Sequence, residues 1–359
     1  MSDDDTTLHL DLVWSAGQQS RKPIEPELFT LLEAIRETGK LTSSAARVGL
    51  HYRQAWELIA KWSSGIGQPL VVKEQGRGTH LTTLGEHLLW LRERIEARLS
   101  PHLESAVSEV EQQLRGVLDK PEPMICLYAS HDLVLAELRD LLRTRPGPKL
   151  DVRFVGSLDS VVALCKGRCD MAGFHVPEGG LGTGVAEAYQ PWLKPRAQRL
   201  IHFVKRRQGL MVPADNPMGI HTLADVVRTK ARFINRQRGS GTRLALEKML
   251  KDQGIDRADI VGFYSEEFTH LAVAAAVASG MADAGFGIEA AAAKLRLQFI
   301  PMFTEEYYLL VKREMLDQKN FSDLADVLRS EAFRALVNGI PGYDATGAGT
   351  VKSIGEAVC

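Results

Sequence analysis

Side chains that suit anion binding stand at the starts of four predicted helices in the C-terminal two thirds of the sequence. Each start follows an apolar, strand-like segment and combines free backbone N–H groups with a hydroxyl group. Such starts favour small anions, because the N–H groups and the helix dipole both attract negative charge. With arginines and three histidines as further donors, they predict one small-anion site. Its candidate ligands are Ser130, His131, Ser157, His175, Arg236, Arg238, Ser240, Thr242, Thr269 and His270.

A structural role is the alternative for each of these residues. Serine and threonine are common helix caps, and each histidine is as well explained by a place in the core. The arginines have possible ion-pair partners in Glu266 and Glu267. The class of anion is also open: a tetrahedral dianion suits many neutral donors, whereas a small carboxylate such as formate suits an arginine fork. Candidates for that fork are Arg236, Arg238 and Arg243.

The elements that must position these residues begin after the proline-containing break at residues 121–123. Residues 124–128, 150–155 and 170–174 have the apolar character of strands, and helical patterns follow the first two. Alternating strands and helices predict a parallel α/β sheet covered on both faces. Ligands of such sheets bind at the carboxyl ends of the strands, beside helix starts.

The N-terminal third carries a predicted helix-turn-helix at residues 41–62. Ala45 permits a close crossing of its two helices, and Gly49 suits a tight turn with a positive φ. The second of these helices, residues 52–63, has apolar side chains at helical spacing, Trp56 among them. Its first turn exposes polar side chains that suit base edges and phosphates, as in a recognition helix.

A hairpin wing is predicted next. Residues 70–72 and 79–81 read as strands around a glycine-rich, partly basic tip. Three helices followed by a wing predict DNA binding, whereas an ordinary three-helix core with a polar surface is the alternative for the helices alone. Lys73 and Arg77 would contact the phosphate backbone or the minor groove. The predicted DNA-binding residues are Ser43, His51, Tyr52, Arg53, Gln54, Lys73 and Arg77.

A long helix is predicted from Thr83, with apolar residues at steps of three and four as far as Val117. Pro101 predicts a kink or a restart within it. A stripe of this length favours pairing with a second chain, so we expect a homodimer or a dimer of dimers; the alternative is that the stripe packs on its own domain. Two-fold dimers match palindromic operators in double-stranded DNA.

Bulk composition excludes several classes of protein. The net charge of −1 confines any nucleic-acid contact to a local basic patch. The acidic start lacks the features of a signal peptide, and no apolar run suits a bilayer, so we expect a cytoplasmic protein without membrane association. Cys165 and Cys169 fall one turn apart on an expected helix, but no second cysteine pair completes a metal site. We therefore predict neither a bound metal nor a cofactor.

Residues 28–82 resemble the winged helix of the molybdate-dependent, ModE-type regulators and, more distantly, that of LysR-type regulators. The matching features are GKLTSSAARVGLHYRQAWELI, the wing and the long helix. Such regulators bind palindromic DNA as dimers, which the resemblance implies for this chain. The small molybdate-binding modules that follow the winged helix in ModE-type proteins are missing.

Residues 124–311 resemble the periplasmic-binding-protein-like domain of the molybdate-binding type. The motifs are FVGSLDS, DMAGFHV, RRQGLMV, NRQRGSGTR, EEFTHLAVAAAVASGMADAGFGI and FIPMFTEEYYLLV. The resemblance implies two α/β lobes that close on a ligand and are joined by crossovers near residues 201–212 and 299–311. It also implies molybdate or tungstate as the ligand.

The fold expected is therefore α/β, with an N-terminal all-α winged helix-turn-helix and a C-terminal two-lobed, periplasmic-binding-protein-like domain of type II. We expect a DNA-binding domain at residues 1–82, a linker and dimerisation helix at 83–120, the ligand-binding domain at 121–345 and a loose tail at 346–359. The predicted function is a ligand-responsive transcriptional regulator that senses a small anion such as molybdate or tungstate. The alternatives are the same architecture sensing formate or a similar carboxylate, and a non-regulatory oxyanion-binding protein.

Catalysis and transport are the classes we set aside. Ser130, His131 and Asp132 are adjacent in sequence, but a catalytic triad requires geometry and not adjacency. The sequence contains no G-x-S-x-G elbow, and its G-S-G-T segment lacks the lysine of a phosphate-binding loop. We therefore predict no catalytic residues. The missing signal peptide argues against a transport receptor.

Overall fold

The computed structural model describes residues 10–16, 22–74, 76, 78–118 and 124–358. Residues 10–96 form one compact unit, and the chain from Ala97 onward forms the main part of a second. The unit boundary lies within a long helix, α4 (Thr83–Leu118), which continues through Pro101 without a restart. The four-part division of the chain given above stays a prediction.

The first unit contains three helices and a hairpin in the predicted order. Gly49 adopts the expected positive φ, at 72°, and Gly39 at the end of the first helix has a φ of 64°. The hairpin strands pair antiparallel, and residues 28–71 supply most of the buried apolar side chains. Trp56 does not join that core: it is 42% exposed, because Ala55, Ile59 and Trp62 already fill the inner face of its helix. The elements are β1 (Ser15–Ala16), β2 (Lys22–Pro23), α1 (Pro26–Thr38), α2 (Leu41–Arg47), α3 (Tyr52–Ile66), β3 (Val71–Glu74) and β4 (Gly78–Leu81).

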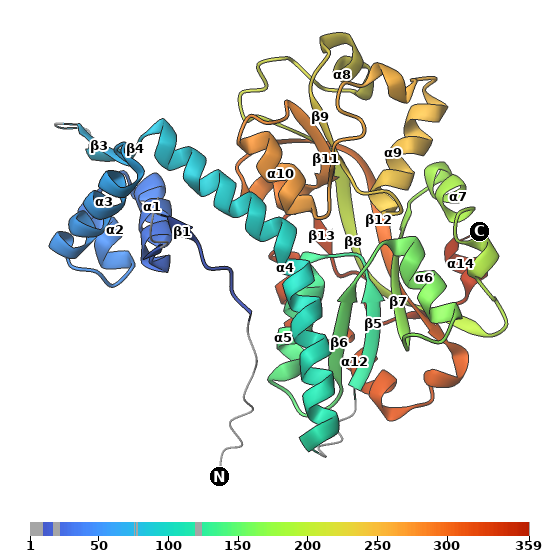
Figure 1. The fold of residues 1–359 in the computed structure, drawn as a ribbon. Helices are drawn as coiled ribbons and strands as arrows, with labels where there is room; N and C mark the ends of the chain where they lie inside the picture. Colours follow the sequence, from blue (N-terminus) through green and yellow to red (C-terminus); the bar gives the residue numbers. More distant parts are fainter. Residues whose placement is uncertain (1–9, 17–21, 75, 77, 119–123, 359) are drawn as a thin grey trace. The chain divides into compact units, whose positions relative to one another are not determined.

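The second unit is built on a ten-stranded sheet with two long antiparallel crossovers, β8 (Gln198–Val212) and β12 (Gln298–Lys312) (Figure 1). These are the crossovers that the sequence predicted. One lobe adds three strands to β12, with parallel pairing among them, and the other adds three strands to β8. The first lobe holds β5 (Met124–Ala129), α5 (Leu133–Arg143), β6 (Lys149–Phe154), α6 (Ser157–Cys165), β7 (Met171–Pro177) and α7 (Gly180–Ala186). The second lobe holds α8 (Leu223–Thr229), β9 (Phe233–Arg236), α9 (Gly241–Asp252), β10 (Glu266–Glu267), α10 (His270–Ala278), β11 (Ala284–Ile288) and α11 (Glu289–Lys294).

Residues 346–358 lie in turns, a paired strand and a helix, which corrects the expectation of a loose tail at residues 346–359 for the part that the structure describes. After α12 (Lys319–Arg329) and α13 (Glu331–Asn338), the short strands β13 (Tyr343–Asp344) and β14 (Val351–Lys352) pair with β8, and α14 (Ile354–Val358) follows. Ala348 and Ile354 are buried. The physical reason is that β11 pairs with only part of one edge of β8. The rest of that edge would expose unpaired backbone N–H and C=O groups, and the C-terminal segment pairs with them.

Three further observations bear on function. Cys169 lies beyond the end of α6 and is buried, so the expected cysteine pair on one helix is wrong. Among the described residues, no group of three or more histidine, cysteine or acidic side chains is placed to hold a metal ion. No helix within these residues combines the length and apolarity that crossing a bilayer requires.

Candidate anion site and DNA-binding surface

The four predicted helix starts are confirmed. Helices α5, α6, α9 and α10 each begin after a strand, with Asp132, Gly156, Ser240 and Thr269 as their N-caps. Asp132, Ser240 and Thr269 each accept a hydrogen bond from a backbone N–H with their side chains, as small polar residues commonly do at helix starts, whereas Gly156 provides no side-chain cap.

Two of the predicted ligand hydroxyls are occupied by this capping. Ser240 accepts a hydrogen bond from the Arg243 N–H and donates one to the Gln237 carbonyl. Thr269 accepts from the Ala272 N–H and donates to the Ala97 carbonyl. The alternative structural role therefore describes both residues in this structure, and we leave them out of the site proposed below.

Other predicted ligands from both lobes meet in one buried place. Ser130, Ser157 and His175 lie together, with 3.4 Å between each pair of their polar atoms. The start of α9 in the second lobe approaches them, since a β-carbon added at Gly241 would lie 3.3 Å from the His175 Cβ and 3.4 Å from the Ser157 Oγ. Next to Gly241, the Thr242 Oγ1 accepts a hydrogen bond of 2.9 Å from the Gln208 side-chain amide.

Arg236, at the end of β9, is the unusual member of this set. It is 1% exposed, and its only side-chain hydrogen bond within the described residues runs from Nε to the Gln237 Oε1, at 3.2 Å. Among the described residues, no carboxylate lies within ion-pair distance of the Arg236 guanidinium. Burial, followed by repulsion from Arg206, lowers the pKa of Arg236 to about 9. A buried arginine with free guanidinium nitrogens can donate charge-assisted hydrogen bonds to an anion.

The predicted histidines share this positive environment. Burial lowers the pKa of His175 and of His270 well below the ordinary value, and the charges of Arg206 and Arg236 lower both further. Burial also lowers the pKa of the partly buried His131 to about 4. The His175 Nε2 and the His270 Nδ1 have no hydrogen-bond partner among the described residues. At neutral pH all three rings are therefore uncharged, and two have a buried ring nitrogen without a hydrogen-bond partner among the described residues.

We name this set the lobe-junction cluster. Its members come from the residue after β5, from α6 and from β7 of one lobe, and from β9, α9 and α10 of the other. They are Ser130, Ser157, His175, Arg236, Thr242 and His270.

The other two fork candidates have different surroundings. The side chain of Arg238 is 75% exposed and lies 3.9 Å from Glu266. Arg243 is buried, but it pairs with Glu247 at 2.7 Å and lies over the Phe263 ring. Ion pairing, the alternative stated for these arginines, describes both.

Residues on the crossovers form a second buried network that the sequence interpretation missed. The Arg206 guanidinium pairs with Asp132 and, at 2.6 Å, with Glu305, while the Tyr343 hydroxyl donates to Asp132. Burial opposes the charge of Arg206, but Glu305 and Asp132 outweigh that penalty and raise its pKa. The available signal was weak: Arg206 and Gln208 stand at strand spacing, but within the polar segment 205–208 between two apolar stretches.

The predicted DNA-binding residues that the structure describes lie on the surface of the first unit. Ser43 on α2, His51 to Gln54 at the start of α3, and Lys73 on β3 are exposed. Gln54 accepts a hydrogen bond from the His51 backbone N–H and so helps to cap α3. The Arg53 side chain is 89% exposed and pairs with Glu57 one turn along. Arg77 falls outside the described residues.

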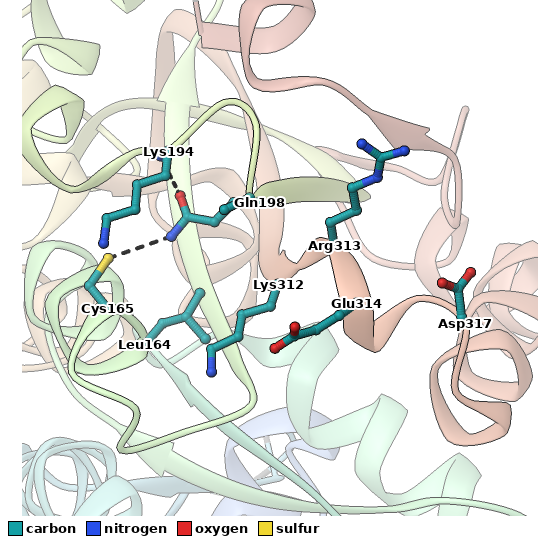
Figure 2. A pocket seen from close by; sticks show the side chains of 9 residues that line it. Leu164, Cys165, Lys194, Gln198, Lys312, Arg313, Glu314 and Asp317 are labelled. Atoms are coloured by element: carbon teal, nitrogen blue, oxygen red, sulfur yellow. Dashed lines mark hydrogen bonds between the residues drawn. The ribbon is translucent and has the colours of Figure 1, made fainter.

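A cavity of about 490 Å³ lies elsewhere, beside the first residues of β8 and the last of β12. Figure 2 shows its lining, in which the Gln198 amide donates to the Cys165 Sγ and accepts from the Lys194 backbone. Lys312, Arg313 and Glu314 complete much of the wall. None of the predicted anion ligands lines this cavity.

Comparisons with known proteins find a matching family model and several relatives. The family model for the PBP superfamily domain matches residues 139–329. The uncharacterized protein YvgK of Bacillus subtilis is 32% identical over 242 residues, which cover 67% of this chain and 77% of YvgK. The molybdenum transport protein ModE of Azotobacter vinelandii is 32% identical over 91 residues, covering 24% of this chain and 32% of ModE. The crystal structure of full-length BenM is 17% identical, with a TM-score of 0.42, and covers 88% of this chain and 98% of that chain.

Proposed function

The chain belongs to the PBP superfamily domain family, and from that premise we propose that it is a non-enzymatic transcriptional regulator that responds to a small anion. The N-terminal helices and hairpin bind DNA in this proposal, and the two-lobed unit binds the anion. The similarity to the transcriptional regulator ModE of Yersinia pestis, which is 28% identical over 88 residues, supports the regulatory part of this proposal. The order of three helices and a hairpin, with an exposed polar first turn on α3, independently supports DNA binding.

The observation that carries the anion-binding half is Arg236. A buried guanidinium without a carboxylate partner is costly in an empty protein, and a bound anion would repay that cost. The charge of Arg236 acts electrostatically on His175 and His270, which belong to the lobe-junction cluster together with hydroxyls from both lobes. An anion bound there would hold the lobes together, and differential affinity for the closed arrangement would shift its population.

Molybdate and tungstate are the oxyanions we propose first, on the strength of the similarity to ModE. Neutral hydroxyls and uncharged histidine rings suit such a tetrahedral dianion. Formate or a similar small carboxylate is the second candidate, because one guanidinium with free nitrogens can donate two parallel hydrogen bonds to a carboxylate.

A melting-temperature screen of the full chain directly tests the proposed anion binding. Molybdate, tungstate, sulfate, phosphate, formate, acetate and glycolate would each be added at rising concentration. A ligand at about 100 times its Kd is expected to stabilise the protein by about 2.7 kcal/mol. If every anion leaves the melting temperature unchanged, the sensor proposal fails.

The DNA half predicts a specific effect of Arg53→Ala. Because Arg53 is exposed on the first turn of α3, its loss is expected to weaken operator binding by roughly 5- to 150-fold if it reads a base. The affinity would be measured by gel shift over a series of salt concentrations, on operators selected from random double-stranded DNA. Lys61→Ala, near the other end of the same helix, is the matched control and is expected to bind as the wild type. Equal affinities for the two variants would remove Arg53 from the interface.

We further propose that the chain acts as a homodimer or a dimer of dimers on palindromic DNA. The support is the apolar stripe of α4, along which several large apolar side chains are exposed: Leu91, Leu99, Val110 and Leu114. Light scattering measures the oligomeric state. Replacing Leu99 and Leu114 with glutamate is expected to lower the molar mass, because the charges would be buried in the dimer.

A further inference from the structure

Two buried acceptor atoms lie next to the lobe-junction cluster. The Gln208 amide nitrogen donates to the Thr242 Oγ1 at 2.9 Å and to the Glu305 Oε1 at 2.7 Å. Arg206 donates to that same Glu305 oxygen. The Gln208 Oε1 and the Glu305 Oε2 are left buried without a hydrogen-bond partner among the described residues. A buried acceptor without a donor costs free energy, so a ligand that donates hydrogen bonds to these two atoms would be stabilised.

These two acceptor atoms lie close to the candidate anion-binding residues. Thr242, which Gln208 contacts, follows Gly241, and the approach of Gly241 to His175 and Ser157 was described above. The carboxylate of Glu305 also acts electrostatically on Arg236. A ligand held by Arg236 and the hydroxyls of the cluster would therefore face a carboxylate and an amide oxygen. An anion with only lone pairs would be repelled by Glu305 and would leave both acceptors unsatisfied.

We propose that this site selects an anion that carries at least one O–H group, which donates to Glu305 and Gln208. The inference rests on the proposed function and narrows its ligand class. A tetrahedral oxyanion is bound in its singly protonated form, and a carboxylate ligand carries a hydroxyl, which excludes formate. Molybdate and tungstate are unprotonated in neutral water, so each takes up one proton on binding. Hydrogen phosphate and a hydroxycarboxylate already carry an O–H group in neutral water.

Paired ligands test this selection in the wild-type protein, without any variant. Phosphate is compared with sulfate, and glycolate with acetate, by calorimetric titration of the full chain at pH 7. A site that hydrogen-bonds an O–H group rejects the analogue without one, so the donor-bearing member is expected to bind at least about tenfold more tightly. Equal or tighter binding of sulfate or acetate overturns the inference. The absence of binding by every anion is a different result, since it overturns the proposed function itself.

Molybdate, if it is the anion that binds, gives a second measurement. Its affinity is expected to fall about tenfold for each unit of rise in pH, because one proton enters with it. The charged and titratable groups that act electrostatically with Glu305 are Arg206 on β8, Arg236 on β9, Tyr307 on β12 and Tyr189, which follows α7. Asp132 shares Arg206 with Glu305, and the rings of His175 and His270 lie in the field of both arginines. A histidine could also take up this proton, so a variant must separate the two. An affinity that does not change with pH overturns the inference.

Glu305→Gln is that variant, since an amide keeps the shape of the side chain and offers an N–H donor to the ligand. It is expected to lose the preference for phosphate over sulfate and the pH dependence of molybdate binding. Glu306→Gln is the matched control: Glu306 pairs with Lys205 and His202, away from the cluster, and this variant should keep both properties. If Glu305→Gln retains the wild-type preference and pH dependence, Glu305 does not accept a ligand proton.

Discussion

Arg236→Met is expected to abolish the thermal stabilisation by the anion and to leave the unliganded protein at least as stable as the wild type. The two effects have one cause. A guanidinium donates charge-assisted hydrogen bonds to an anion, and the loss of two of them costs about 3 kcal/mol or more, equivalent to roughly 100-fold in affinity. Without the anion, the same charge is buried and has no carboxylate partner.

The sign of the stability effect follows from the pKa of Arg236. Burial and Arg206 lower that pKa to about 9 in the folded protein, below its value in the unfolded chain. The unfolded chain therefore binds more protons between these two values, and stability rises with pH across that window. Below pH 9 the penalty is fully present, so methionine removes it at neutral pH. Melting curves with and without the anion measure both effects.

Arg238→Met is the matched control for this prediction. Arg238 lies two residues along the same loop, but its side chain is 75% exposed. The variant should keep both the melting temperature and the response to the anion. A large loss of unliganded stability in Arg236→Met would show that Arg236 has a structural role, and a retained response to the anion would remove it from the site.

Arg206→Met is expected to have the opposite effect on stability. Arg206 is as deeply buried as Arg236, but it neutralises Asp132 and Glu305. Removing it leaves two buried carboxylates without a counter-charge, and breaking a buried ion pair in this way costs about 3–5 kcal/mol. Calorimetric unfolding of the full chain measures the loss in the transition of the two-lobed unit.

The neighbouring residue provides the control. Arg207 is half exposed and pairs with Glu289, so Arg207→Met is expected to change stability by about 1 kcal/mol or less. Combining Arg206→Met with Asp132→Asn and Glu305→Gln should recover part of the loss, because the uncompensated charges are then gone. If Arg206→Met and Arg207→Met unfold alike, the buried network does not stabilise the lobe junction.

The two arginines explain why part of the site escaped sequence interpretation. The sequence singled out Arg236 because it precedes a glycine-rich helix start, which is a local signal. Arg206 lies in the middle of a long strand, where neither its spacing nor its neighbours mark its partners. Asp132 is 74 residues away and Glu305 is 99 residues away along the chain. Their pairing depends on the register of β8 against β12.

Ser240 and Thr269 show the converse limit. Both are helix caps, as their sequence positions predicted, but capping and anion binding call for the same residue types. Only the hydrogen bonds from Ser240 to Gln237 and from Thr269 to Ala97 distinguish the two roles. Ser157 has the same local sequence signal, yet its hydroxyl faces Ser130 and His175 from neighbouring strands.

The sequence by itself determined the order of helices and strands, the positive-φ turn at Gly49, the four helix starts and the two crossovers. Apolar periodicity, caps and glycine conformation act over a few residues, and the long motifs carried the family resemblance. Tertiary structure alone decided which helix starts share a buried junction, which arginine has a carboxylate partner, and that the C-terminal segment pairs with β8. Those outcomes depend on contacts between segments far apart in the chain, where burial and the geometry of charged partners set the free energy.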